Sequence, residues 1–217
     1  MPLDPDLLGA YLAACLVLIL LPGPDMMFVL GQTLAGGARR GWAAVLGILL
    51  GALCHVALAA LGVAAVIAAE PALFSALRLA GAAYLIWLGL QALRQAWSGG
   101  AVAVEAAPGA PRAPGVLPRG VVVQGALTNL LNPKVGLFFL AFLPQFVDPG
   151  RAPAAVQMLL LGPLLPILAV PFFALVIAGA GRAAGWLSRS ARASRALNGA
   201  AGAIFLGLGV RLLLAPR

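Results

Sequence analysis

Long apolar stretches dominate the chain, and short gaps between them carry most of its polar residues. A transmembrane helix needs about 20 consecutive, mainly apolar residues. Six stretches approach or exceed that length, and they are Leu7–Leu34, Trp42–Ala68, Leu73–Trp97, Val121–Val147, Ala154–Ala180 and Leu197–Leu214. The pattern therefore predicts an all-α polytopic membrane protein with six transmembrane helices.

Composition narrows the class of protein further. Of 217 residues, 63% are hydrophobic and only 9% are charged, whereas a soluble domain carries about 25% charged residues. This balance excludes an ordinary soluble enzyme, a disordered chain and a small disulfide-built module. The net charge of +8 falls mainly in the gaps, where it orients membrane helices rather than binding nucleic acid. Cys15 and Cys54 lie inside apolar stretches and are interpreted as buried hydrophobic residues, so no metal or cofactor is expected.

The two halves of the chain have a similar order of apolar stretches and proline interruptions. The first and fourth stretches are each interrupted by proline, and GAAYLIWLGL from Gly81 is similar to GAAGAIFLGL from Gly199. We interpret residues 1–97 as a first three-span repeat, 98–118 as a cytoplasmic linker rich in Gly, Ala and Pro, and 119–217 as a second repeat. Because three is odd, consecutive copies insert with opposite orientation, a layout typical of secondary transporters. The alternative is a chance similarity between two Gly- and Ala-rich segments.

Basic residues predict the orientation, since cytoplasmic loops are enriched in Lys and Arg. Three alternate gaps hold most of the arginines, and their members are Arg39, Arg40, Arg94, Arg112, Arg119, Arg182, Arg189, Arg192 and Arg195. The other gaps hold Glu70 in one case and Asp148 with Arg151 in the other. Both termini are therefore expected outside, in a bacterial inner membrane. If the interrupted first stretch does not cross, the N-terminus lies inside instead.

The two interruptions are candidate binding elements. In LPGPDMM the helix is expected to stop near Pro22 and Gly23 and to restart with Pro24, while in LTNLLNPKVG Asn132 is a plausible N-cap before Pro133. Restarted helices direct free N–H groups and a positive dipole end at the membrane centre, which suits a carboxylate. The carbonyls released before each break suit an ammonium group. A zwitterion such as an amino acid carries both charges.

Charged and polar residues at the breaks complete the candidate site. Asp25 could accept a substrate ammonium or a coupling proton, and Lys134 could hold the carboxylate or release Asp25 on its protonation. The alternative is a structural ion pair between them. Thr128 and Asn129 either line the pocket or bond neighbouring helices, and His55 either relays protons or is a packed histidine. The predicted substrate-binding set is Pro22, Gly23, Pro24, Asp25, Thr128, Asn129, Asn132, Pro133 and Lys134, with Asp25 and His55 as proton-coupling candidates.

These motifs resemble a known family. LPGPDMM, GGARRG, RLAGAAYLIWLGLQALR and GALTNLLNPKVGLFFLAFLPQFV are similar to elements of the LysE/RhtB family of bacterial amino-acid exporters. The signature elements correspond to Pro22–Pro24 and Asn132–Lys134. The resemblance implies efflux of amino acids from the cytoplasm, driven by proton movement, without a cofactor and without enzymatic activity.

The residues favour a neutral substrate such as homoserine, threonine or leucine. Exporting lysine or arginine would favour a second buried anion, and Asp25 is the one carboxylate deep in an apolar stretch. The alternative function is an inorganic-cation exporter or channel, which would need several converging carboxylates or thiolates. The expected partners are a small amino acid and the lipid bilayer, without nucleic acid, and a homo-oligomer stays open.

The linker interpretation predicts that deleting much of Ser98–Pro118 spares membrane insertion, because this segment has no apolar period and enough length to be shortened. Membrane fractionation of tagged protein, with protease protection of the tag, measures the outcome. A deletion variant that no longer inserts would show that the segment is part of the folded unit.

Overall fold

The computed structural model describes residues 2–63, 71–98, 118–148, 150–180 and 191–214. These parts of the chain are helical and contain no strand. The longer elements are α1 (Pro5–Leu20), α2 (Pro24–Leu58), α4 (Pro71–Ser98), α5 (Pro118–Leu130), α8 (Leu164–Ala178) and α10 (Ala191–Leu214). The shorter ones are η1 (Ala59–Val63), α6 (Pro133–Leu137), η2 (Phe138–Phe142), η3 (Leu143–Phe146) and α7 (Ala154–Leu161). The predicted all-α class is therefore confirmed.

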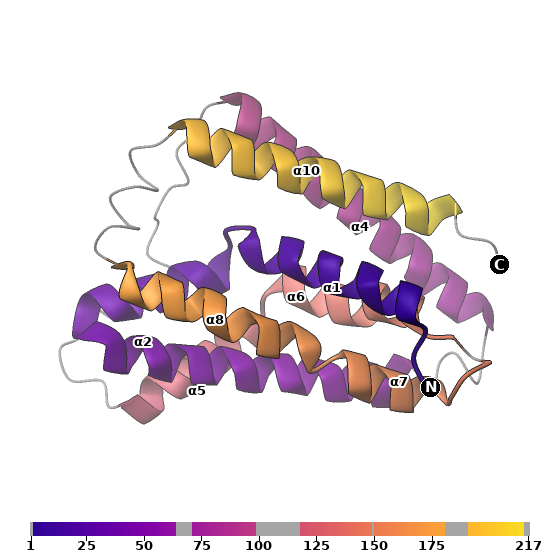
Figure 1. Ribbon diagram of the computed structural model, residues 1–217, viewed down its shortest axis with the longest axis horizontal. Coiled ribbons are helices and arrows are strands. Elements are labelled where there is room, and N and C mark those ends of the chain that lie inside the picture. The colour runs from indigo at the N-terminus through magenta and orange to yellow at the C-terminus, as the bar shows by residue number, and fades with distance from the viewer. Residues whose placement is uncertain (1, 64–70, 99–117, 149, 181–190, 215–217) are drawn as a thin grey trace.

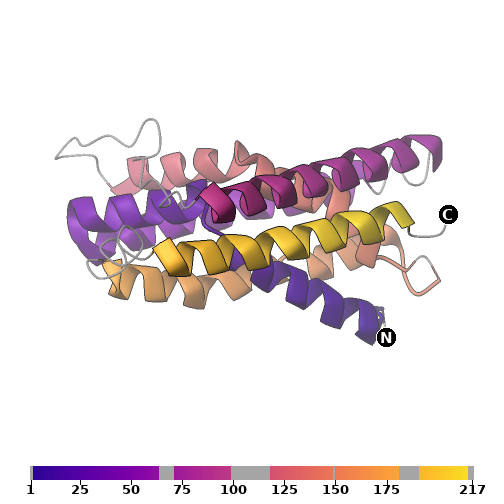
Figure 2. The same ribbon diagram turned by 90° about the horizontal axis from the view of Figure 1, so that it is seen from above.

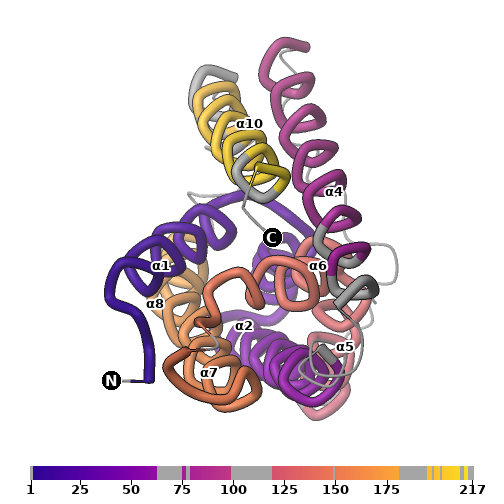
Figure 3. Tube along the Cα trace, turned by 90° about the vertical axis from the view of Figure 1, so that its right-hand side faces the viewer, coloured from indigo at the N-terminus to yellow at the C-terminus, as the bar shows by residue number. Residues whose placement is uncertain are grey.

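The helices run broadly along one axis (Figures 1 and 2). Most of them form one bundle, whereas α4 and α10 pack on each other and extend to one side of it (Figure 3). One apolar core joins Tyr11 to the aromatic rings of Phe138 and Phe146. A second core lies between α2 and α8 and includes Val45 and Phe173.

Helix length and composition support only part of the predicted span count. Among the described residues, Pro24–Gly62 and Ala154–Ala178 are long and apolar enough to cross a membrane. A third candidate is Arg119–Leu130 with Pro133–Phe146, a pair bent by 54° at the second break. Six spans and two inverted repeats stay predictions, and residues 99–117 of the expected linker lie outside the described part of the chain.

A sharp bend inside α2 lies in the predicted gap between the first two stretches, which ends at Trp42. Gly36 and Gly37 have non-helical backbone angles, and Gly37 has a positive φ of 73° that glycine adopts without strain. The Arg40 guanidinium donates to Gln32 Oε1 at 2.8 Å from Nη2, across the bend. Figure 1 shows α2 turning back at one end of the bundle, so two helical segments meet at a sharp reversal close to the predicted boundary at Leu34.

The same end of the bundle holds the starts of α5 and α10, while α1 begins and α10 ends at the opposite end (Figure 1). Four arginines therefore lie at this end of the molecule. Arg39 and Arg40 follow the bend in α2, while Arg119 and Arg195 lie near the starts of α5 and α10.

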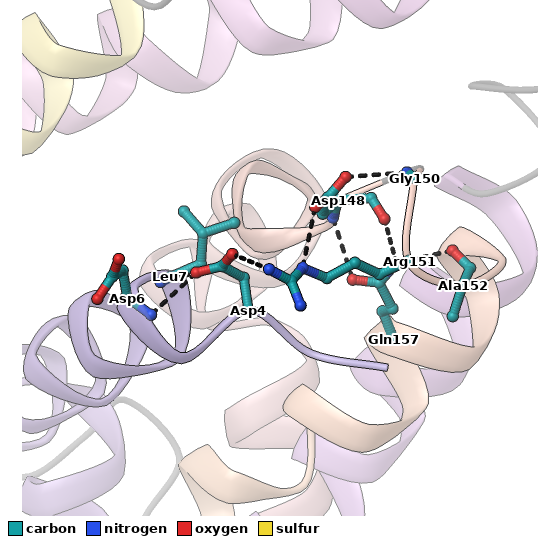
Figure 4. Close-up of polar contacts among 8 residues, drawn as sticks. All are labelled: Asp4, Asp6, Leu7, Asp148, Gly150, Arg151, Ala152 and Gln157. Atoms are coloured by element: carbon teal, nitrogen blue, oxygen red, sulfur yellow. Dashed lines mark hydrogen bonds and ion pairs between the residues drawn. The ribbon is translucent and has the colours of Figure 1, made fainter. Parts of the chain in front are cut away.

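At the opposite end, an exposed ion-pair network ties the start of α1 to the turn before α7 (Figure 4). The Asp4 carboxylate caps α1 by accepting from the Asp6 and Leu7 N–H groups at 2.9 and 3.2 Å. Arg151 donates to Asp4 at 2.7 Å and to Asp148 at 3.1 Å. These contacts hold the pKa of Asp4 below its usual value. The hydrogen bond from the Leu7 N–H has the largest effect, followed by the Asp6 N–H and the charge of Arg151.

Close contact between α2 and α5 depends on glycines. A Cβ at Gly47 would overlap the backbone oxygen of Val122, and one at Gly125 would lie 2.6 Å from the Ala44 oxygen. The two helices therefore approach backbone to backbone, as small residues permit in membrane proteins. This contact brings the second break against α2.

Gly47→Ala should destabilise the protein by about 1–3 kcal/mol, because the added methyl group forces α2 and α5 apart. Gly31→Ala is the matched control, since a Cβ there meets nothing within 4 Å. Reversible unfolding of both variants in detergent measures the difference. A Gly47→Ala protein as stable as the control would contradict the observed α2–α5 contact.

Candidate functional site

The first break lies between α1 and α2 and follows directly from its prolines. In a continuous helix the carbonyls of Leu18 and Leu20 would accept from residues 22 and 24, and both are proline, which has no N–H. Gly23 is extended at φ −171°, and α2 restarts with Pro24 at its first position. The predicted stop and restart are therefore confirmed.

The second break has the predicted cap. α5 ends at Leu130, and Pro133 is the first residue of α6. The Asn132 side-chain oxygen accepts from the Lys134 N–H at 3.1 Å, which satisfies one N–H that the start of a helix leaves free. The chain then bends by 54° relative to α5. The restart places the Lys134 side chain toward the first break.

Lys134 joins the two breaks. Its Nζ donates to the carbonyl oxygens of Leu18 at 3.2 Å and Leu21 at 2.9 Å. Gly23 leaves room for this contact, since a Cβ there would lie 3.1 Å from Nζ. The breaks therefore meet, but the carbonyls expected to receive a substrate ammonium are occupied by the ammonium of Lys134.

Asp25 has a different partner. Its Oδ2 accepts from Asn129 Nδ2 at 2.8 Å, while its buried Oδ1 has no hydrogen-bond partner. In the described part of the chain, the ion pairs join Arg151 to Asp4 and to Asp148, and none joins Asp25 to Lys134. The structural ion pair that the sequence left open is therefore absent between these two described residues, although both line one cavity.

That cavity, here called the first cavity, has a volume of about 50 Å³. Its polar lining comes from Asp25, Asn129 and Lys134. The remaining wall is apolar and consists of Leu18, Ile19, Leu21, Met26, Ile48, Leu49, Ala52, Val135, Leu165, Pro166, Ala169, Phe172 and Phe173. In this conformation the space holds a few water-sized groups, so an amino acid enters only if the wall moves.

A second cavity of about 230 Å³ lies on the other side of the breaks. The breaks contribute Leu21, Pro22, Gly23, Pro24, Asn132, Pro133 and Lys134, and the α4–α10 pair contributes Tyr84, Trp87, Leu88, Gln91, Ala92, Gln95 and Asn198. Sequence reasoning missed the amides of Gln91, Gln95 and Asn198. Gln91 and Gln95 lie four residues apart on α4, and this spacing could have marked one polar helix face.

Two predicted residues lie beside the cavities rather than in their lining. Thr128 donates to the Gln124 carbonyl of its own helix at 2.8 Å and does not line either cavity. His55 Nε2 lies 3.3 Å from the Asn129 carbonyl oxygen, and its ring stacks on Phe139 at 5.9 Å. His55 is thus a packed histidine that contacts the backbone of the residue bonded to Asp25.

In this bundle two interrupted helices meet, with an acid and a base at their junction. This arrangement is typical of secondary transporters. The sequence model described as LysE type translocator matches residues 16–215. The chain belongs to this family, which confirms the resemblance found in the sequence.

Individual relatives cover nearly the whole chain. An uncharacterized membrane protein of Pseudomonas aeruginosa is 36% identical, with 94% of each chain covered. Leucine efflux proteins of Enterobacter sp. strain 638 and Salmonella typhimurium are each 30% identical, with 93% of this chain and 92% of the relative covered. No solved structure matches this chain. The family and the apolar helices together identify a membrane translocator.

Asn132→Ala should cost about 1 kcal/mol of stability, because the first turn of α6 loses its side-chain cap. Asn132→Ser is the matched variant, since serine is also a good N-cap, and it should recover most of the loss. Chemical unfolding in detergent compares the two. Equal stability of the alanine and serine variants would mean that the cap does not hold the second break.

Proposed function

We propose that this protein exports neutral amino acids with apolar side chains from the cytoplasm across the inner membrane, in exchange for protons. The observation that carries the proposal is the first cavity, where one carboxylate, one ammonium and one amide face walls that are otherwise apolar. The relatives named leucine efflux proteins support the same substrate class.

The charges of the first cavity match those of a zwitterion. Asp25 supplies the negative charge of the site, and its buried Oδ1, which has no hydrogen-bond partner, is free to bond a cation when the site is loaded. The free N–H groups in the first turn of α2, together with the Lys134 ammonium, are suited to the substrate carboxylate. An aliphatic side chain would then lie against Ile48, Phe172 and Phe173, where burying it is favourable.

The number of acids in the cavities argues for a neutral side chain. Among the residues that the structure describes, Asp25 is the one acidic residue that lines either cavity. A lysine or arginine substrate would bring a second cation without a second anion, which is costly at low dielectric. We therefore favour leucine and similar amino acids over basic ones.

Proton exchange fits the position of Asp25. When the cation that bonds Asp25 in the loaded site moves away, a proton on the carboxyl group would replace the lost positive charge, so each transport cycle would return a proton. The described contacts link His55 to Asp25 through Asn129, which makes His55 a secondary coupling candidate.

The proposed topology has six spans in two inverted repeats, with the arginine-rich end in the cytoplasm and both termini outside. Support comes from the two proline breaks, each restarting with proline in the first turn. The side-by-side packing of α4 and α10, which would be the third span of each repeat, also supports it. The shared end of Arg39, Arg40, Arg119 and Arg195 fits the positive-inside rule, while Arg151 lies at the opposite end.

The alternative function, an inorganic-cation exporter or channel, needs a cluster of hard or soft ligands. Among the described residues no group of three or more His, Cys, Asp or Glu side chains could hold a metal ion. No observation therefore favours it over amino-acid export.

Inside-out vesicles that hold an imposed proton gradient, acidic inside, test the proposal. Labelled leucine should accumulate and labelled lysine should not. Asp25→Asn should lower the gradient-driven accumulation at least about tenfold, the effect of losing roughly 1.4 kcal/mol of coupling. Asp148→Asn is the matched control on the exposed turn and should transport normally. Unchanged pH dependence in Asp25→Asn would assign coupling to another residue, and absence of leucine uptake in the parent protein would overturn the proposed function.

A further inference from the structure

The end of α1 presents two carbonyl oxygens that accept hydrogen bonds from an ammonium group. Because residue 22 is proline, the Leu18 carbonyl has no N–H partner four residues on, and the Leu21 carbonyl lies beyond the end of α1. Lys134 Nζ donates to both oxygens, at 3.2 and 2.9 Å. These two oxygens are called the carbonyl pair below. An amino acid carries an ammonium group with the same charge and the same three N–H donors as lysine.

The position of Lys134 also separates two spaces. Lys134 and Leu21 are the two residues that line both cavities. With its ammonium on the carbonyl pair, the lysine stem stands between the first cavity, which contains Asp25, and the second cavity under α4. A closed partition of this kind keeps the two cavities from forming one continuous path.

A second acceptor for Lys134 is available in the first cavity. Asp25 lines the same cavity, its buried Oδ1 accepts no hydrogen bond, and no ion pair joins it to Lys134. A lysine stem has four rotatable bonds and carries a point charge without a fixed fork. The ammonium can therefore exchange the neutral carbonyls for a carboxylate without any change in the net charge of the site.

We propose that Lys134 is an internal substitute for the substrate, which occupies the carbonyl pair in the empty transporter and is displaced by the substrate ammonium. The displaced lysine turns toward Asp25 and the substrate carboxylate, and the partition between the two cavities opens only when an amino acid has replaced it. This inference rests on the proposed function. It explains why acid and base share a cavity without pairing, and it links opening of the path to the presence of substrate.

The test is equilibrium binding to the purified full-length protein in detergent. The probe is 3-methylbutylammonium, which is leucine without its carboxylate, so Lys134 can act on it only as a competitor. Lys134→Met keeps most of the stem and removes the ammonium, and it should bind the probe at least about tenfold more tightly than the parent protein does. Arg151→Met removes a charge from the exposed turn and should leave probe affinity unchanged.

A quaternary probe separates competition from simple electrostatics. Trimethyl(3-methylbutyl)ammonium has the same charge but no N–H donor, so it cannot bond to the carbonyl pair. Its affinity should not rise with that of the primary ammonium in Lys134→Met. Adding Gly23→Ala to Lys134→Met should cancel the gain, because the new Cβ lies 3.1 Å from the position of the lysine nitrogen.

Each outcome decides the inference. Equal gains for both probes would leave only an electrostatic effect, and no gain for the primary ammonium would show that Lys134 does not compete for the carbonyl pair; either result overturns the proposal. If Lys134→Met does not fold, both probes are compared on Lys134→Gln. Its neutral amide competes for the carbonyl pair more weakly than an ammonium does, so the primary ammonium should still gain more affinity than the quaternary one. Leucine transport by the parent protein is measured separately, so failure of the proposed function is distinguishable from failure of the substitute role.

Discussion

A membrane interior offers no water to backbone groups that lose their helical partners, and this constraint governs the structure around the first break. Prolines 22 and 24 remove the donors that the last turn of α1 needs. An unsatisfied carbonyl in such surroundings costs several kcal/mol. The ammonium of Lys134 supplies hydrogen bonds to two of these carbonyls from a distant part of the chain. Contact with the second break therefore stabilises the first.

This contact positions the remaining polar groups. With α6 held against the end of α1, Asn129 reaches Asp25, and His55 contacts the Asn129 backbone. The glycine-mediated approach of α2 and α5 supplies the rest of the geometry. The outcome is a small polar centre enclosed by apolar walls, with α8 closing one side. A site of this type combines charge recognition of a zwitterion with tolerance of an aliphatic side chain.

Several features of the site could be predicted from the sequence because they depend on local chemistry. Proline without an N–H, asparagine as a helix cap and a charge inside an apolar stretch each have consequences that do not require a partner to be known. The two breaks and the cap of Asn132 follow from such rules. The expectation that Asp25 and Lys134 face each other came instead from the proposed inverted repeat. Thr128 was predicted as a lining residue, yet it bonds to its own helix and lies outside both cavities, since a side chain one turn from a break can face any direction around the helix.

The sequence by itself determined the helical class, the family and the location of the interruptions, because hydrophobic length and backbone chemistry are properties of contiguous residues. Only the tertiary structure decided which hydrogen-bond donor pairs with which acceptor. It paired Lys134 with carbonyls instead of Asp25, and it brought Gln91 and Gln95 of α4 over the breaks. These contacts depend on how the helices approach one another in three dimensions. Glycines without a Cβ set the distance between α2 and α5, and the length of the Lys134 side chain sets the distance between the two breaks.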